Sequence, residues 1–136
     1  MRILIAVLML ALGAAPTLAA DKFRVSATVT TSDPSATDRL GQALVAEFQK
    51  HPELQIDTEH PQAKVIINAT RDAASAKNPN GWSFAVVQVG NVDGAAGQGV
   101  FQSVNVGHAD ELTDPNVKGF AEAITKNLLA SLQAKK

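Results

Sequence analysis

The sequence predicts a single α/β domain of the α+β kind: a two-layer sandwich with two helices on one face of a mixed four-stranded sheet. The 136-residue chain is 46% apolar and 18% charged, a balance that favours a packed core. Apolar residues alternate with a period of two in four segments and recur every three or four residues in two others. The resulting order is β-α-β-β-β-α, and a helix between the first two strands indicates that they are parallel.

The first strand and the first helix have clear periodicities. Residues 23–30 alternate between apolar and polar side chains, which is typical of a half-buried strand. From residue 36 to residue 50 the spacing changes, and Leu40, Leu44 and Phe48 follow one another at intervals of four. These three side chains therefore lie on one face of a helix, and the proline that follows the segment ends it.

The remaining elements follow the same two patterns. Leu54–Ile56 is a short extended piece outside the four strands. The other strands are expected at residues 64–71, 82–89 and 100–106. The last two are expected to pair antiparallel because a short glycine-rich loop joins them. Asp114 is expected to cap a final helix that continues to about Gln133.

The first twenty residues have the pattern of a secretory signal. Arg2 precedes the apolar run from Ile3 to Ala15, and small residues follow it. Cleavage after Ala19 or Ala20 is expected to leave one domain, residues 21–136, with no membrane insertion afterwards. The periplasm of a Gram-negative bacterium is the expected location, and release from the cell is the alternative.

The composition argues against several classes of function. The net charge is −1 and no basic cluster is present, so neither nucleic acid nor an anionic membrane surface is expected as a main partner. The chain has no cysteine and therefore no thiolate ligand or cysteine nucleophile. No familiar hydrolase motif is present, and the three histidines lack the spacing of metal ligands. A non-enzymatic protein without metal or cofactor is therefore expected.

The sheet face without helices is the first candidate binding surface. The strand alternation places Ile66, Val87, Phe101 and Arg24 on this face. If the strand register aligns the first three, they form an apolar patch of the kind that marks a partner surface. A sheet edge is the second candidate, since an unpaired edge accepts a strand from a partner or from a second copy of the chain.

A small-molecule or metal-ion carrier is the alternative to protein binding. Its residues would be Asp93 and Gly94, in the glycine-rich loop, together with His108 and Asp110. A loop of this composition between two antiparallel strands is typical of a hairpin tip, and a loop tip often serves in binding.

The element order resembles small periplasmic modules of bacterial envelope assemblies. The resemblance covers most of residues 21–136 and depends on four segments: residues 40–48, 63–67, 82–106 and the run Gly-His-Ala-Asp-Glu-Leu at 107–112. The similar families are the N-terminal domain of the Tol–Pal translocation protein TolB and the lipoprotein activators of penicillin-binding proteins. The lipid-carrying cysteine of the second family has no counterpart in this chain. The resemblance implies an envelope location and binding to another envelope protein.

Overall fold

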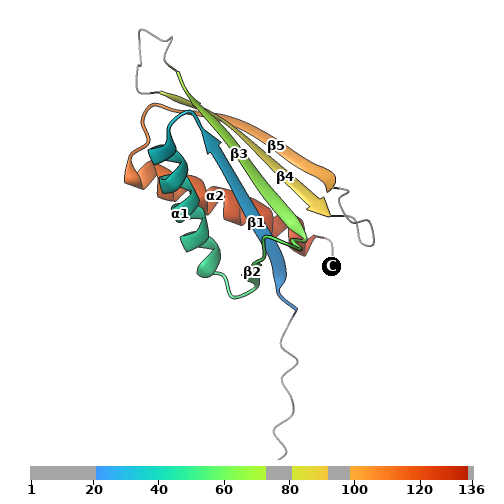
Figure 1. The fold of residues 1–136 in the computed structure, drawn as a ribbon. Helices are drawn as coiled ribbons and strands as arrows, with labels where there is room; N and C mark the ends of the chain where they lie inside the picture. Colours follow the sequence, from blue (N-terminus) through green and yellow to red (C-terminus); the bar gives the residue numbers. More distant parts are fainter. Residues whose placement is uncertain (1–20, 73–80, 92–98, 135–136) are drawn as a thin grey trace, which may run out of the picture.

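A computed structural model describes residues 21–72, 81–91 and 99–134. They form two helices and one mixed sheet of five strands (Figure 1). In chain order the elements are β1 (Phe23–Thr31), α1 (Pro34–Gln49), β2 (Leu54–Ile56), β3 (Ala63–Arg71), β4 (Trp82–Asn91), β5 (Gly99–Ala109) and α2 (Asp114–Gln133). The predicted α+β class is confirmed.

The number of strands is where the prediction was wrong, since the sheet has five and not four. Leu54–Ile56 is a true strand that pairs in parallel with the first three residues of β1. The Phe23 amide donates to the Glu53 carbonyl at 2.8 Å, and the Asp57 amide donates to the Val25 carbonyl at 2.9 Å. Three residues are too short to show a period of their own, so only this pairing identifies them as a strand.

The strand order is β2-β1-β3-β4-β5, which places β1 next to the edge strand β2. β1 runs parallel to both of its neighbours, whereas the β3–β4 and β4–β5 pairs are antiparallel. The predicted parallel first pair and the antiparallel hairpin are therefore both present. Between Gln88 and Val89 the β4–β5 register shifts, so the two strands pair with different offsets on either side of that point.

The first helix begins two residues earlier than the sequence predicts. Asp33 is its N-cap, and the Asp33 carboxylate accepts the Ser35 amide at 2.9 Å. Pro34 occupies the first helical position, where its missing N–H has no cost. Leu40, Leu44 and Phe48 are all buried on the face that the spacing predicts.

The second helix is capped by Thr113, not by Asp114 as the sequence predicts. The Thr113 hydroxyl accepts the Asn116 amide at 3.4 Å, and Asp114 lies in the first turn, where a negative charge is favourable. The helix ends at Gln133, as predicted. Its buried side is apolar apart from Thr125, whose hydroxyl donates to the Ala121 carbonyl at 2.8 Å.

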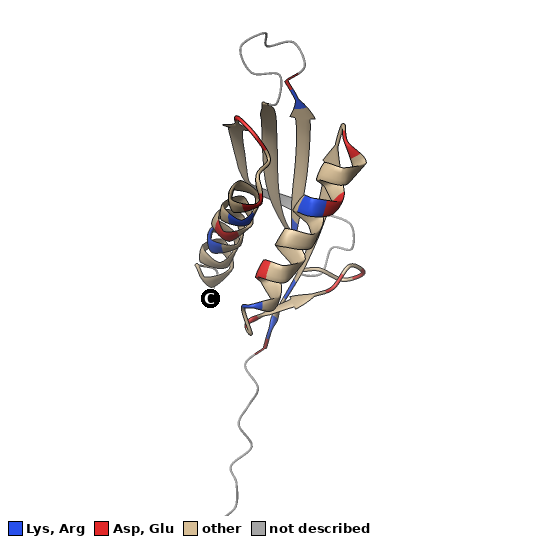
Figure 2. Ribbon diagram, turned by 90° about the vertical axis from the view of Figure 1, so that its left-hand side faces the viewer, with Lys and Arg blue, Asp and Glu red and all other residues tan. Residues whose placement is uncertain are grey.

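Both helices cover the same face of the sheet (Figures 1 and 2). The core lies between these two layers and includes Val65 and Ile67 from β3 and Trp82 and Phe84 from β4. The Phe84 ring lies 4.8 Å, centroid to centroid, from the Phe120 ring of α2. Among the described residues, no helix lies over the opposite face of the sheet. Within the described residues, neither helix has the length and apolar character needed to span a membrane.

Candidate functional site

The helix-free face of the sheet carries a band of apolar side chains across three strands. Ile66 of β3 pairs with Val87 of β4, and Val87 pairs with Val104 of β5. In the adjacent row Ala85 pairs with Val106. Val104 is 48% exposed and Val106 is 81% exposed, the highest value among the exposed large apolar residues of the described chain. We call these five residues the open-face patch.

The open-face patch contains two of the four residues that the sequence predicts for this face. Ile66 and Val87 are direct neighbours, as the prediction requires. The third place in their row belongs to Val104, whereas Phe101 pairs with Val89 in the next row. The Phe101 side chain lies outside the described residues. Arg24 lies on the same face, on β1, and its backbone amide donates to the Gln62 side-chain oxygen at 2.8 Å.

The alternative site around His108 is only partly described. Asp93 and Gly94 lie outside the described residues. The His108 ring is 3.0 Å from the Asp72 carboxylate and 3.5 Å from the Asp110 carboxylate. In the described ranges, no group of three or more histidine, aspartate or glutamate side chains has the arrangement of a metal site. No observation on the described residues therefore favours the carrier hypothesis over protein binding.

A serine lies next to this histidine cluster, but its geometry does not match a nucleophile–base pair. The Ser83 hydroxyl donates to the Asp72 carboxylate at 2.9 Å. In a hydrolytic triad the hydroxyl would bond to the imidazole, which would accept its proton. Here Asp72 joins Ser83 and His108, and the Asp72 amide also donates to the Gly81 carbonyl at 2.8 Å. These contacts link the end of β3, which Asp72 follows, to Ser83 of β4 and His108 of β5.

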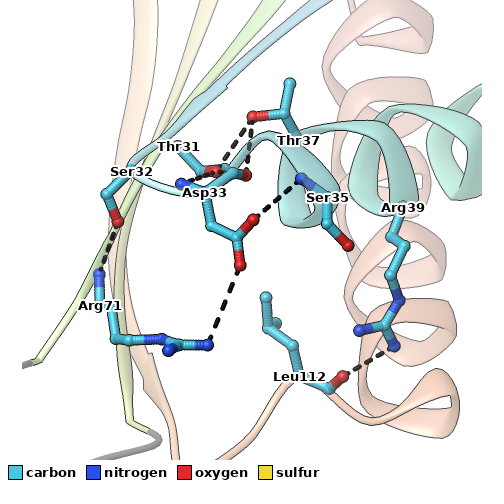
Figure 3. Close-up of polar contacts among 8 residues, drawn as sticks. All are labelled: Thr31, Ser32, Asp33, Ser35, Thr37, Arg39, Arg71 and Leu112. Carbon is cyan, nitrogen blue, oxygen red and sulfur yellow. Dashed lines mark hydrogen bonds and ion pairs between the residues drawn. The ribbon is translucent and has the colours of Figure 1, made fainter.

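A small polar hollow lies where β1 ends and α1 begins (Figure 3). It has a volume of about 180 Å³, and two arginines, Arg39 and Arg71, line it. Arg39 donates to the Leu112 carbonyl at 2.8 Å and pairs with the Asp114 carboxylate at 2.7 Å. It therefore ties the first helix to the chain at the start of the second.

Arg71 occupies the opposite wall of the hollow. Its guanidinium is 3.9 Å from the Asp33 carboxylate and 5.5 Å from the centre of the Trp82 ring. The Arg71 amide also donates to the Ser32 hydroxyl at 3.3 Å (Figure 3). Both arginines thus already have carboxylate partners. The hollow lies between the ends of β1 and β3 and the starts of the two helices. No local pattern in the sequence marks either arginine as part of a site.

The end of α1 holds a second charged cluster, around Glu47. The Glu47 side chain is only 10% exposed and pairs with Lys50, and the His51 ring lies 3.5 Å away. The hydrogen bond from Lys50 lowers the pKa of the Glu47 carboxyl below its ordinary value of 4.5, although desolvation opposes the shift. The same hydrogen bond raises the pKa of Lys50 above 10.5. His51 belongs to the same helix-end cluster.

The Glu47 cluster makes a prediction about stability and pH. A carboxyl whose pKa is lowered by folding stabilises the protein above its unfolded pKa, and the effect is lost as the pH falls through the folded value. Because Lys50 is half exposed, Glu47→Gln is expected to cost about 0.5–1 kcal/mol of unfolding free energy at neutral pH. In acid below pH 4.5 the two proteins should converge. Urea unfolding at neutral and acid pH measures this, and a difference that grows in acid would contradict it.

No known protein family, characterised protein or solved structure matches this chain. The function is therefore inferred from the surfaces of the chain itself.

Proposed function

We propose that this chain is an exported, non-enzymatic binding module that contacts another envelope protein through the open-face patch. The observation that carries the proposal is the continuous apolar band of Ile66, Val87 and Val104 on a sheet face that neither of the two described helices covers. Exposed apolar side chains gathered on one face are typical of protein contact surfaces. Val106, which is highly exposed, continues the band along β5.

The export part of the proposal rests on the first twenty residues. Their short positive start, apolar run and small residues have the order of a cleaved signal. The resemblance to small periplasmic modules supports the same location. Expression of the full chain in a Gram-negative host, followed by mass spectrometry of the periplasmic fraction, should give a protein that begins at Ala20 or Asp21. A protein that keeps Met1 and stays with the membrane would contradict export of a cleaved domain.

The binding part is tested by a charge placed in the open-face patch. Val106→Asp puts a carboxylate at a highly exposed position, so we expect the fold to be unchanged. A carboxylate forced against an apolar partner surface loses its hydration without gaining a counter-charge. We therefore expect Val106→Asp to weaken capture of the partner from crosslinked envelope extract by about tenfold or more.

The matched control is Ala123→Asp on α2. Ala123 is also an exposed apolar residue, but it lies on the helix side of the molecule. One envelope protein should be captured in equal amounts by the original chain and by Ala123→Asp, and should be lost with Val106→Asp. Equal capture by both variants would show that the open-face patch is not the contact surface.

A further inference from the structure

A second surface, separate from the open-face patch, lies at the outer edge of β1. β2 pairs only with Phe23 to Val25 of β1, so from residue 26 to Thr31 none of the described strands lies on the outer side of β1. The other side of β1 is paired with β3 up to Thr31. The sheet therefore has a gap next to β1 where a further strand would lie if β2 were longer.

The backbone groups that face this gap can be identified from the paired part of β1. Phe23 and Val25 use their backbone groups toward β2, and successive residues alternate in direction. The N–H and C=O groups of Ala27 and Val29 therefore point outward. In residues 21–72, 81–91 and 99–134, no backbone hydrogen bond is found for these outward groups. They are a row of donors and acceptors that an added strand would satisfy.

An apolar groove of about 580 Å³ lies beside the same edge, under α1. Its apolar lining comes from β1, α1 and β2 and includes Ala27, Val29, Gly41, Val45, Phe48 and Ile56. Val45 and Ile56 are 40% and 39% exposed, and they are two of the four exposed large apolar residues in the described chain. The other two, Val104 and Val106, belong to the open-face patch. An added strand would place alternate side chains against this lining.

The charges around the groove indicate what the strand would carry. Asp38, which is exposed, is the only charged residue of the lining. Asp57 and Glu59 lie in the loop after β2, where Figure 2 shows acidic residues, and they alternate with the lining residues Ile56 and Thr58. The Asp57 carboxylate accepts the His60 amide at 2.8 Å and the Glu59 amide at 3.0 Å. One acidic side chain in the lining and two in the loop after β2 would favour a lysine or arginine on the added strand, in competition with Arg24, whose charge helps to lower the pKa of the Asp57 carboxyl.

We propose that the outer edge of β1 from Ala27 to Thr31, with its groove, binds an extended segment of a partner protein by strand addition. The segment would have about five residues, with apolar side chains at alternate positions and a lysine or arginine at one end. Its backbone would pair with Ala27 and Val29, and its apolar side chains would cover Val45 and Ile56. This surface shares no residue with the open-face patch, so the two proposals are tested independently.

The test is a selection of random peptides on the protein purified from a host that expresses the full chain. Peptides are selected for binding to the original protein and against binding to Gly41→Trp. A Cβ at Gly41 would meet no atom within 4 Å, so a large side chain there fills the groove without disturbing the helix. The matched control is Gly41→Ala, which adds one carbon in the same open space. Circular dichroism confirms that both variants are folded.

The expected result has three parts. Selected peptides alternate apolar residues with others and contain a lysine or arginine. Their affinity falls at least about tenfold with Gly41→Trp and with Val45→Asp, and is retained with Gly41→Ala and Val106→Asp. The amide hydrogens of Ala27 and Val29 become protected from exchange when a selected peptide binds. N-methylation of the peptide at alternate backbone positions removes the binding.

Three results would overturn the proposal. The first is that no peptide is enriched over the Gly41→Trp counter-target. The second is that enriched peptides leave the Ala27 and Val29 amides unprotected. The third is a dimer in sedimentation that Gly41→Trp converts to a monomer, which would show that a second copy of the chain occupies the edge. Retained capture of the envelope partner by Gly41→Trp would keep the proposed function intact in any of these cases.

Discussion

Leu44→Ala is expected to lower the free energy of unfolding by about 2–5 kcal/mol. Leu44 lies on α1, is fully buried, and belongs to the core cluster that joins both helices to the sheet. Truncation removes three carbons from this core and leaves a cavity. The cost combines the lost transfer free energy of those carbons with the contacts that their neighbours lose.

Urea unfolding measures this loss. Trp82 is the only tryptophan of the chain and is buried, so its fluorescence reports the opening of the core. The matched control is Val45→Ala, at the next position of the same helix. Val45 is 40% exposed, so the change is expected to stay within about 0.5 kcal/mol of the original protein. Equal losses in the two variants would mean that α1 does not bury the face assigned to it.

The strongly periodic elements were predictable because burial leaves a regular mark in the sequence. The spacing of Leu40, Leu44 and Phe48 identified the buried face of α1, and all three are core residues. The alternation of Trp82 with Phe84 identified the core side of β4 in the same way. These patterns record which side faces the core, which depends only on local geometry.

Short elements and helix starts were less predictable, because other parts of the fold determine them. β2 is a strand only because its three residues find β1 beside them, and nothing in Leu-Gln-Ile requires that. At the start of α2, Thr113 and Asp114 both have side chains suited to capping. The backbone places Thr113 at the cap and moves Asp114 into the first turn, where it also pairs with Arg39.

Which β3 and β4 residues lie on the helix-free face was predictable, but their neighbours on β5 were not. Alternation assigned Ile66 and Val87 to this face, and the structure places them side by side. Their third neighbour is Val104, whereas Phe101 pairs with Val89 in the next row, beyond an irregularity in the β4–β5 pairing. An extra residue in one strand changes which residues meet across it, and alternation alone contains no sign of where that happens.

The β1 edge illustrates the same limit for binding surfaces. Its groove combines the side chains of β1, α1 and β2, and the gap exists because β2 stops after Ile56. A sheet edge was predictable as a candidate surface, but which edge is free follows from the strand order. Long-range pairing determines that order, and a local period carries no information about it.

A pair of proline substitutions tests the assignment of inner and outer backbone groups on β1. The Arg24 carbonyl accepts the Gln62 amide at 2.7 Å, and the Ser32 amide donates to the Ala69 carbonyl at 3.3 Å. Even-numbered residues of β1 therefore face β3, and the Thr28 N–H belongs to that ladder. Proline has no N–H, so Thr28→Pro removes a ladder hydrogen bond from the middle of the sheet. Val29→Pro removes only an outward donor, and proline is tolerated at such edge positions.

Thr28→Pro is therefore expected to be less stable than Val29→Pro by at least about 2 kcal/mol, the cost of leaving a buried carbonyl without its donor. The fixed φ of proline and its effect on the preceding residue are common to both variants, so they cancel in the comparison. Urea unfolding followed by Trp82 fluorescence gives the two free energies. Equal losses would mean that the Val29 N–H is also paired, so that β1 has no free edge at this position. That N–H is one of the donors that would bond to an added strand. Val29→Pro should therefore also lower the affinity for the selected peptides while the domain stays folded.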